Sequence, residues 1–185
     1  MKTIAATLPG ACLIELEPRS DSRGSFSRTF CEREFAELGL ESRFPQHSVS
    51  YSEHIGTLRG MHFQRPPFHE VKVVRCLQGA IFDVIVDLRQ DSPTYLRWQG
   101  FQLTAGDHRQ LYIPSGFAHG FQTLTARTEV SYLISNWFEP SAATGVRYDD
   151  PAFAIDWPLA VIEISPKDAT WPLLDSAVRA GGPPR

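Results

Sequence analysis

Two polar segments of the sequence carry side chains that could move protons. The segment Gly56–Gln64 (GTLRGMHFQ) contains Arg59 and His62, and Lys72 follows shortly after it. Histidine titrates near neutral pH, so His62 is suited to act as a general base. The cationic side chains of Arg59 and Lys72 suit a phosphate group or a developing oxyanion. Together these residue types indicate proton abstraction from an anionic substrate.

A tyrosine and an aspartate could complete such a site, although each has an ordinary structural reading. Tyr132 lies in the apolar run EVSYLI, where its hydroxyl could exchange a proton or simply face the rim or core of a sheet. Asp168 follows Lys167 in the segment ISPKDA. A carboxylate there is typically solvated, but it could orient an imidazole if the chain returns to the site. The sequence pattern leaves both readings open.

Two segments resemble the paired motifs of the cupin superfamily, many of whose members bind a metal. They are Gly56–Gln64 and Pro114–Phe121, and the second contains His119. Metal-binding cupins use His-x-His in the first motif, whereas this chain has Gln64 at the second position. A neutral amide is a poor ligand for borderline metals. Lys72, two residues after Glu70, should share its strand face and repel a cation. We therefore expect no metal, and a metal-dependent cupin oxygenase or isomerase is the alternative.

The elements around these residues read as mostly β structure. The 185 residues fit a single domain over 1–185, with a frayed tail at about 180–185. Strand-like runs recur between turn residues, at Ala11–Leu16, Phe44–Ser52, Val71–Leu77, Ala80–Asp87, Tyr95–Leu103, Gln110–Ile113 and Glu129–Trp137. One stretch, Cys31–Leu40, predicts a helix with Phe35, Leu38 and Leu40 on its apolar side. This pattern indicates an all-β sandwich or barrel with one or two short helices.

Composition argues against several classes of partner. The net charge is −3 and 42% of residues are hydrophobic, which does not favour nucleic acid or a membrane surface. No apolar run approaches the ~20 residues of a membrane span, and the first ten residues do not resemble a secretory signal. The three cysteines are widely spaced, which is typical of reduced thiols in a cytoplasmic protein.

The motifs taken together resemble the dTDP-4-dehydrorhamnose 3,5-epimerase family over about residues 21–169. The matching stretches are DSRGSF (21–26), TLRGMHFQ (57–64), FDVIVDLR (82–89) with SPT (92–94), IPSGFAHGF (113–121), DDP (149–151) and IDWP (155–158). The resemblance implies a cupin-type jelly-roll β-barrel that forms a homodimer with an N-terminal strand exchanged between subunits. It also implies a cofactor-independent isomerase acting on a nucleotide-linked 4-keto-6-deoxyhexose. The expected reaction is 3,5-epimerisation of dTDP-4-dehydro-6-deoxy-D-glucose to dTDP-4-dehydro-L-rhamnose.

The resemblance assigns roles to individual residues. It makes His62 the base, paired with Asp168, and Tyr132 the acid on the opposite face of the sugar, with Lys72 near the C4 oxygen. The positions that the resemblance assigns to substrate binding are Arg23, Phe26, Gln46, Arg59, His119 and Phe138. A ketone at C4 acidifies the hydrogens at C3 and C5, so a base, a cation and an acid suffice, and no nicotinamide or flavin is implied.

The sequence departs from the family pattern at several positions, including Arg28 for an acid, Ser48 for Asn, Glu70 for Gln and Phe138 for Tyr. Most of these positions face the nucleotide side or the sugar rim. They leave open the nucleotide and whether C3, C5 or both are epimerised. A non-catalytic sugar-nucleotide-binding module is a further alternative, but binding alone does not require an acid and a base on opposite faces.

Overall fold

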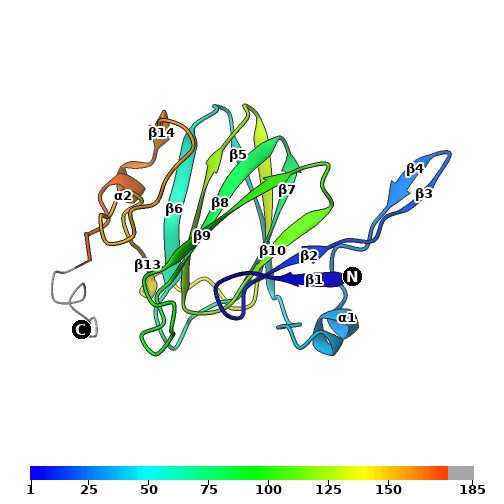
Figure 1. Cartoon of the computed structure of the whole chain (residues 1–185), viewed down its shortest axis with the longest axis horizontal. Helices are drawn as coiled ribbons and strands as arrows, with labels where there is room; N and C mark the ends of the chain where they lie inside the picture. Colours follow the sequence, from blue (N-terminus) through cyan, green and yellow to red (C-terminus); the bar gives the residue numbers. More distant parts are fainter. Residues whose placement is uncertain (175–185) are drawn as a thin grey trace.

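The computed structural model describes residues 1–174, which form two antiparallel sheets facing each other (Figure 1). The first sheet has six strands in the order β1 (Lys2–Ala5), β2 (Cys12–Glu15), β10 (Arg109–Ile113), β7 (Lys72–Gln78), β12 (Thr128–Ile134) and β5 (Gln46–Ser52). The second sheet contains β13 (Ala143–Gly145), β6 (Thr57–Gln64), β11 (Phe117–Thr123), β8 (Ala80–Asp87) and β9 (Trp98–Thr104) in that order, with β14 (Glu163–Ile164) pairing parallel to β6. This arrangement confirms the expected all-β fold.

The core lies between the two sheets because each strand turns alternate apolar side chains inward. Val74 and Val130 of the first sheet pack in one buried cluster with Ile81, Ile85 and Phe121 of the second. These side chains are almost fully buried, and they fill one end of the space between the sheets. Polar side chains occupy the other end, where the site lies.

The predicted helix exists but is shorter than expected. Helix α1 spans Glu32–Glu37, whereas the pattern predicted Cys31–Leu40. It ends there because Gly39 adopts a left-handed backbone, with φ of 71°, which breaks the helical hydrogen bonding. Phe35 is fully buried as predicted, but Leu38 is 37% exposed, so its assignment to the apolar side was wrong.

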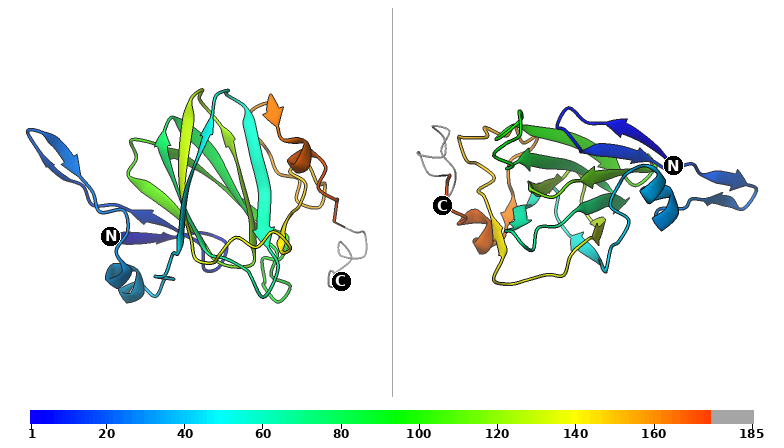
Figure 2. Two further views of the ribbon diagram at one scale, coloured as in Figure 1. Left: turned by 180° about the vertical axis from the view of Figure 1, so that it is seen from behind. Right: turned by 90° about the horizontal axis from the view of Figure 1, so that it is seen from below.

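A narrow hairpin near the N-terminus leaves the body of the protein. Its strands β3 (Arg19–Asp21) and β4 (Gly24–Phe26) pair only with each other and project away from both sheets (Figures 1 and 2). Phe26, the last residue of β4, is 69% exposed, which is unusual for a large apolar ring. We call residues 19–26 the arm.

The C-terminal part of the described chain returns to the second sheet. After β14, helix α2 (Pro166–Ala169) contacts β6. The sequence left open whether Asp168 is a solvated loop residue or returns to the site. The chain does return, so the second reading holds. The predicted tail at 180–185 lies outside the described residues. No helix within residues 1–174 has both the length and the apolar character needed to cross a bilayer.

Candidate active site

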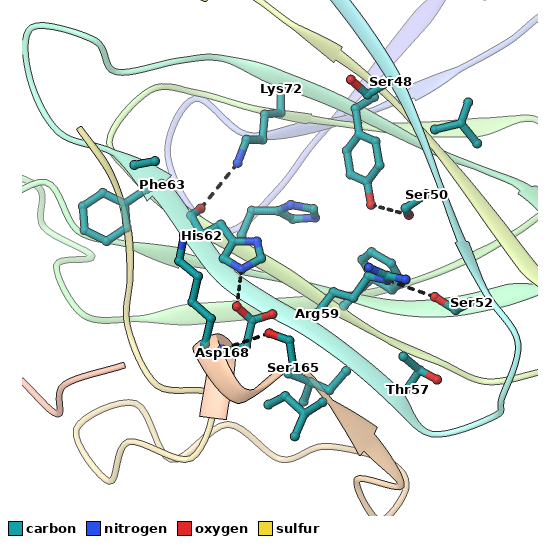
Figure 3. Close-up of a pocket in the computed structure, with 18 of the residues that line it drawn as sticks. Ser48, Ser50, Ser52, Thr57, Arg59, His62, Phe63, Lys72, Ser165 and Asp168 are labelled. Carbon is teal, nitrogen blue, oxygen red and sulfur yellow. Dashed lines mark hydrogen bonds and ion pairs between the residues drawn. The ribbon is translucent and has the colours of Figure 1, made fainter. Parts of the chain in front are cut away.

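A cleft of about 910 Å³ opens between the sheets. It is lined by β5, β7 and β12 of the first sheet, by β6 and β11 of the second, and by the returning segment around α2 (Figure 3). Eight of the ten predicted site residues line it, namely Gln46, Arg59, His62, Lys72, His119, Tyr132, Phe138 and Asp168. Residues distant in sequence therefore meet in one cavity.

His62 and Asp168 form a close pair on the β6 side of the cleft. Nε2 of His62 lies 2.7 Å from Oδ1 of Asp168. A carboxylate only accepts hydrogen bonds, so in the neutral imidazole the Nε2 atom carries the proton and Nδ1 is left free to accept one. The His62 side chain is 44% exposed and that of Asp168 only 7%. The imidazole can therefore meet a substrate, while its partner is shielded.

Local backbone geometry explains why Arg59 and His62 share a face. Simple strand alternation would place residues three apart on opposite faces. The pairing of β6 with β11 shifts register between His119 and Phe121, opposite Gly60. A Cβ at Gly60 would lie 2.5 Å from the Cα of Gly120, so only glycine fits this irregularity. In Figure 3, Arg59 and His62 both extend into the cleft.

Asp168 is held by its helix and by the backbone of β6. Its own N–H donates to Oγ of Ser165, the N-cap residue of α2, at 3.0 Å. The N–H of Gly60 donates to the second carboxylate oxygen at 3.2 Å. Burial alone would raise the pKa of Asp168, but the hydrogen bonds from His62 and Gly60 and the charge of His62 outweigh it and lower the pKa. The carboxylate therefore stays charged beside the imidazole.

Tyr132 faces this pair from the other sheet. It comes from β12, and its hydroxyl lies 2.9 Å from Oγ of Ser50 on β5, a bond drawn in Figure 3. Burial raises the pKa of Tyr132 well above its usual range, and the opposing hydrogen bond with Ser50 is too weak to reverse this. The phenol is therefore protonated at neutral pH and can donate a proton.

Lys72 is fixed in the cleft by two contacts of its ammonium group. Its Nζ lies 3.0 Å from Glu70 Oε1 and donates to the carbonyl of His62 at 3.4 Å. Glu70 in turn accepts from Nε2 of Gln64 at 2.9 Å. Gln64 also donates to the carbonyls of Phe68 and Trp137. Gln64 thus holds Glu70 and the neighbouring main chain in place by hydrogen bonds. Glu70 and Lys72 lie on the same side of the chain, as predicted.

His119 lines the cleft from β11 but belongs to a buried pair. Its Nε2 lies 3.0 Å from Oδ1 of Asp83 on β8. The side chains are only 5% and 0% exposed. The sequence had shown Asp83 only as a break in an apolar strand, and this break was the available signal for the pair.

The remaining predicted residues divide between the cleft rim and the arm. Arg59 donates to Oγ of Ser52 and to the carbonyl of Tyr51. Within residues 1–174 no carboxylate lies at ion-pair distance from it, so its charge is available to an anion. Gln46 Oε1 accepts from the N–H of Phe138 at 2.6 Å, which ties the rim loop to β5.

Arg23 and Phe26 are not brought to the cleft of their own chain. Both lie on the arm, and Arg23 pairs with Asp21 while 87% of its side chain is exposed. Ser50 and Trp171 are among the cleft residues that sequence reasoning did not assign to the site. Ser50 ends the segment QHSVS (46–50), which corresponds to a family motif, but Ser50 itself was assigned no role, and Trp171 lies beyond the stretch that resembles the family, which ends at about residue 169.

Residues 1–174 contain no group of three or more His, Cys, Asp or Glu side chains placed to hold a metal ion. The amide of Gln64, at the position of a cupin ligand, is instead committed to Glu70 and to main-chain groups.

Comparison with known proteins agrees with this geometry. The family model described as dTDP-4-dehydrorhamnose 3,5-epimerase matches residues 5–176. A curated relative, the dTDP-4-dehydrorhamnose 3,5-epimerase of Methanothermobacter thermautotrophicus, is 45% identical over 95% of this chain and 96% of its own.

Two solved structures of relatives carry ligands. The enzyme of that name from Bacillus anthracis, solved with TDP and pyrophosphate, has a TM-score of 0.91 and 43% identity over 94% of this chain and 99% of its own. The dTDP-6-deoxy-D-glucose-3,5-epimerase of Legionella pneumophila, solved with dTDP-4-keto-L-rhamnose, has a TM-score of 0.89 and 38% identity, and the match covers 96% of each chain. The two sheets thus form a cupin-type jelly roll, and the chain belongs to the dTDP-4-dehydrorhamnose 3,5-epimerase family of sugar-nucleotide isomerases.

Proposed function

We propose that this enzyme epimerises C3 and C5 of dTDP-4-dehydro-6-deoxy-D-glucose to give dTDP-4-dehydro-L-rhamnose. The observation that carries the proposal is the placement of a base and an acid on opposite walls of one cleft. His62 comes from the second sheet and Tyr132 from the first. A sugar between them would present opposite faces to the two groups, as inversion of a carbon centre requires.

The first step is removal of the hydrogen beside the ketone. Nδ1 of His62 takes the proton, and the electron pair of the C–H bond moves to the C4 oxygen as an enolate. Asp168 stabilises the imidazolium that forms, since it remains charged beside Nε2. The Lys72 ammonium, nearly buried in the same cleft, stabilises the enolate oxygen.

The second step returns a proton from the other face. Tyr132 donates its phenolic proton to the carbon as the enolate collapses to the ketone, which inverts the centre. The raised pKa of Tyr132 supports this role, because it keeps the phenol protonated until the carbanion takes its proton. His62 has then gained one proton and Tyr132 has lost one, and exchange with solvent restores both groups before the next centre reacts.

The nucleotide end of the substrate lies at the open rim. We assign the diphosphate to Arg59, whose guanidinium retains N–H groups free of protein carboxylates. Gln46 and Phe138, joined by a hydrogen bond, offer an amide and an exposed ring to the nucleoside. Phe138 is 61% exposed, as a ring that stacks on a ligand base would be.

We assign Arg23 and Phe26 to the cleft of a second protomer in a homodimer. The projecting arm and the exposed ring of Phe26 support this assignment. Mixing Arg23→Ala protomers with His62→Gln protomers tests it, because a hybrid dimer would then contain one intact cleft. Activity above that of either parent is expected, and activity no higher than the parents' would exclude exchange of the arm. The free cysteines Cys12, Cys31 and Cys76 support a cytoplasmic location.

Hydrogen exchange tests the proposed function most directly. The enzyme is incubated with dTDP-4-dehydro-6-deoxy-D-glucose in D₂O, and the C3 and C5 proton signals are followed by NMR. Loss of both signals with formation of the L-rhamno product supports the proposal. Loss of one signal would identify a single-site epimerase. Retention of both by folded protein would refute action on this substrate.

A further inference from the structure

Trp171 lies beside the His62–Asp168 pair and has no role in the chemistry above. It follows α2 and lines the cleft. Its ring centroid is 6.5 Å from that of the His62 imidazole, with the rings inclined at 74°. An edge-to-face contact of this kind restricts the orientation of both rings.

The indole occupies space that one glycine leaves open. Gly145 on β13 is the cross-strand partner of His62. A Cβ at Gly145 would lie 2.5 Å from Cε2 and Nε1 of Trp171, and 2.6 Å from the carbonyl oxygen of Met61. Any other residue at this position would displace the indole or the strand. Trp171 therefore packs directly on the ladder that carries His62.

The outer face of the indole is also held. Nζ of Lys167 lies 5.1 Å from the centroid of the Trp171 ring, within the range of a cation–π interaction. Because Lys167 belongs to α2 and immediately precedes Asp168, this contact ties the indole to the same helical turn that presents the carboxylate.

The indole N–H points to a functional reason for this packing. Nε1 of Trp171 is buried and makes no hydrogen bond of good geometry. An unpaired buried donor is costly, so such groups require an explanation. The N–H also adds to the effects of His62 and Gly60 that lower the pKa of Asp168 against burial.

We propose that Trp171 is a positioning residue for the His62–Asp168 pair, a role that rests on the proposed function. Its indole shields the Asp168 carboxylate from water and fixes the plane of the imidazole toward the sugar. Water at this point would screen the interaction between the two side chains and would offer His62 a competing hydrogen-bond partner. The indole acts through His62 and does not touch the reacting carbon.

Substitutions of Trp171, with a matched control, distinguish a shielding role from a contribution to stability alone. Trp171→Ala removes the wall and should lower kcat about tenfold while KM changes less than about twofold, since the nucleotide is bound elsewhere. Trp171→Phe keeps an aromatic wall and should retain kcat within about threefold of the parent. Trp157→Phe, a matched change outside the cleft, should leave kcat unchanged. Wild-type kcat in folded Trp171→Ala would overturn the proposal.

NMR of the unliganded protein supplies a readout that does not depend on turnover. The proton on Nε2 of His62, assigned by its loss in His62→Gln, should be visible in the wild-type protein because Trp171 protects it from exchange with water. Its absence from the wild-type spectrum would refute the shielding even if Trp171→Ala failed to fold. Presence of the signal in a protein that exchanges no substrate hydrogens would refute the proposed function, while the shielding of the His62–Asp168 pair by Trp171 would still be supported.

Discussion

Two histidine–aspartate pairs lie side by side, with both histidines on the second sheet, and they differ mainly in burial. His62 and His119 are cross-strand partners on β6 and β11. Each places Nε2 within 3.0 Å of an aspartate oxygen. The His62 side chain is 44% exposed, whereas that of His119 is 5% exposed. The same two residue types therefore occupy very different environments a few ångströms apart.

The two aspartates respond to burial in opposite directions. Burial raises the pKa of Asp83, and the charge and hydrogen bond of His119 oppose it only in part. In Asp168 the hydrogen bonds prevail and the pKa is lowered. A charged carboxylate beside an exposed imidazole can support proton transfer, whereas a desolvated pair mainly organises the core. Residue type alone does not distinguish a catalytic pair from a structural one.

The largest expected effect is a loss of activity when the exposed histidine, His62, is replaced. His62→Gln keeps a polar side chain of similar reach but removes the base, and kcat should fall about a thousandfold. Unfolding by urea should change little, because the side chain is half exposed and the introduced amide N–H can still donate to Asp168. His47→Gln is the matched control, since His47 lies outside the cleft and should tolerate the change. A loss of less than tenfold in His62→Gln would remove His62 from the role of base.

The buried pair should respond through stability. His119→Asn leaves Asp83 buried without its partner, and the free energy of unfolding should fall by about 3 kcal/mol at pH 7. The raised pKa of Asp83 means that its neutral form is favoured in the folded state. The deficit should therefore be largest at neutral pH and shrink as the pH falls toward the ordinary aspartate range. Urea unfolding at pH 7 and pH 5 measures this.

The control for this prediction removes both members of the buried pair. Asp83→Asn combined with His119→Asn should recover part of the lost stability, since no uncompensated charge remains. An unchanged free energy of unfolding in His119→Asn, together with a kcat loss above tenfold, would place His119 in the chemistry and would contradict the distinction between the pairs.

Asp168→Asn tests the exposed pair from its other side. An amide accepts a hydrogen bond but cannot balance the imidazolium charge, so kcat should fall about a hundredfold. The lowered pKa of Asp168 gives a stability contribution that is present above the ordinary aspartate pKa and is lost as the pH falls through the folded value. The variant should therefore lose stability at neutral pH but not in strong acid. An equal loss of stability at neutral pH and in strong acid would contradict a stabilising role for the charge of Asp168.

Local sequence pattern was enough to predict the fold class and about half of the site. Strand-like runs at residues 80–87 and 110–113 became β8 and β10, because short apolar, β-branched runs between turn residues are typical of buried strands. His62, Lys72 and the shared face of Glu70 and Lys72 were also readable, since they lie within one or two strands. The site's position between two sheets depends on strand pairing over long separations, which local pattern does not encode.

The residues that sequence reasoning left open depend on such long-range contacts. Asp168 reaches His62 across 106 positions of the chain, through the parallel pairing of β14 with β6. Trp171 acquires its place by packing against Gly145 of β13, a contact that the local sequence around either residue does not show. The arm carries Arg23 and Phe26 away from its own cleft, and no feature of their local sequence shows this.

A third acid–base pair, Glu70 with Lys72, lies between the other two in burial and gives the smallest expected effect. The side chains are 11% and 12% exposed, and the ammonium of Lys72 faces the cleft. The carboxylate 3.0 Å away offsets part of the positive potential that an enolate oxygen would meet. Glu70→Gln should therefore raise kcat about threefold, because the amide can still accept from Gln64 but carries no charge.

A double-substitution cycle decides whether Glu70 acts through Lys72. If it does, Glu70→Gln should leave kcat unchanged in a Lys72→Gln background, since there is no ammonium left for the carboxylate to offset. An equal rise in both backgrounds would mean that the carboxylate acts on the substrate itself. A fall in kcat in the single variant would mean that anchoring of Lys72 matters more than its free charge. The pair would then resemble the buried His119–Asp83 pair, whose partners hold each other in place.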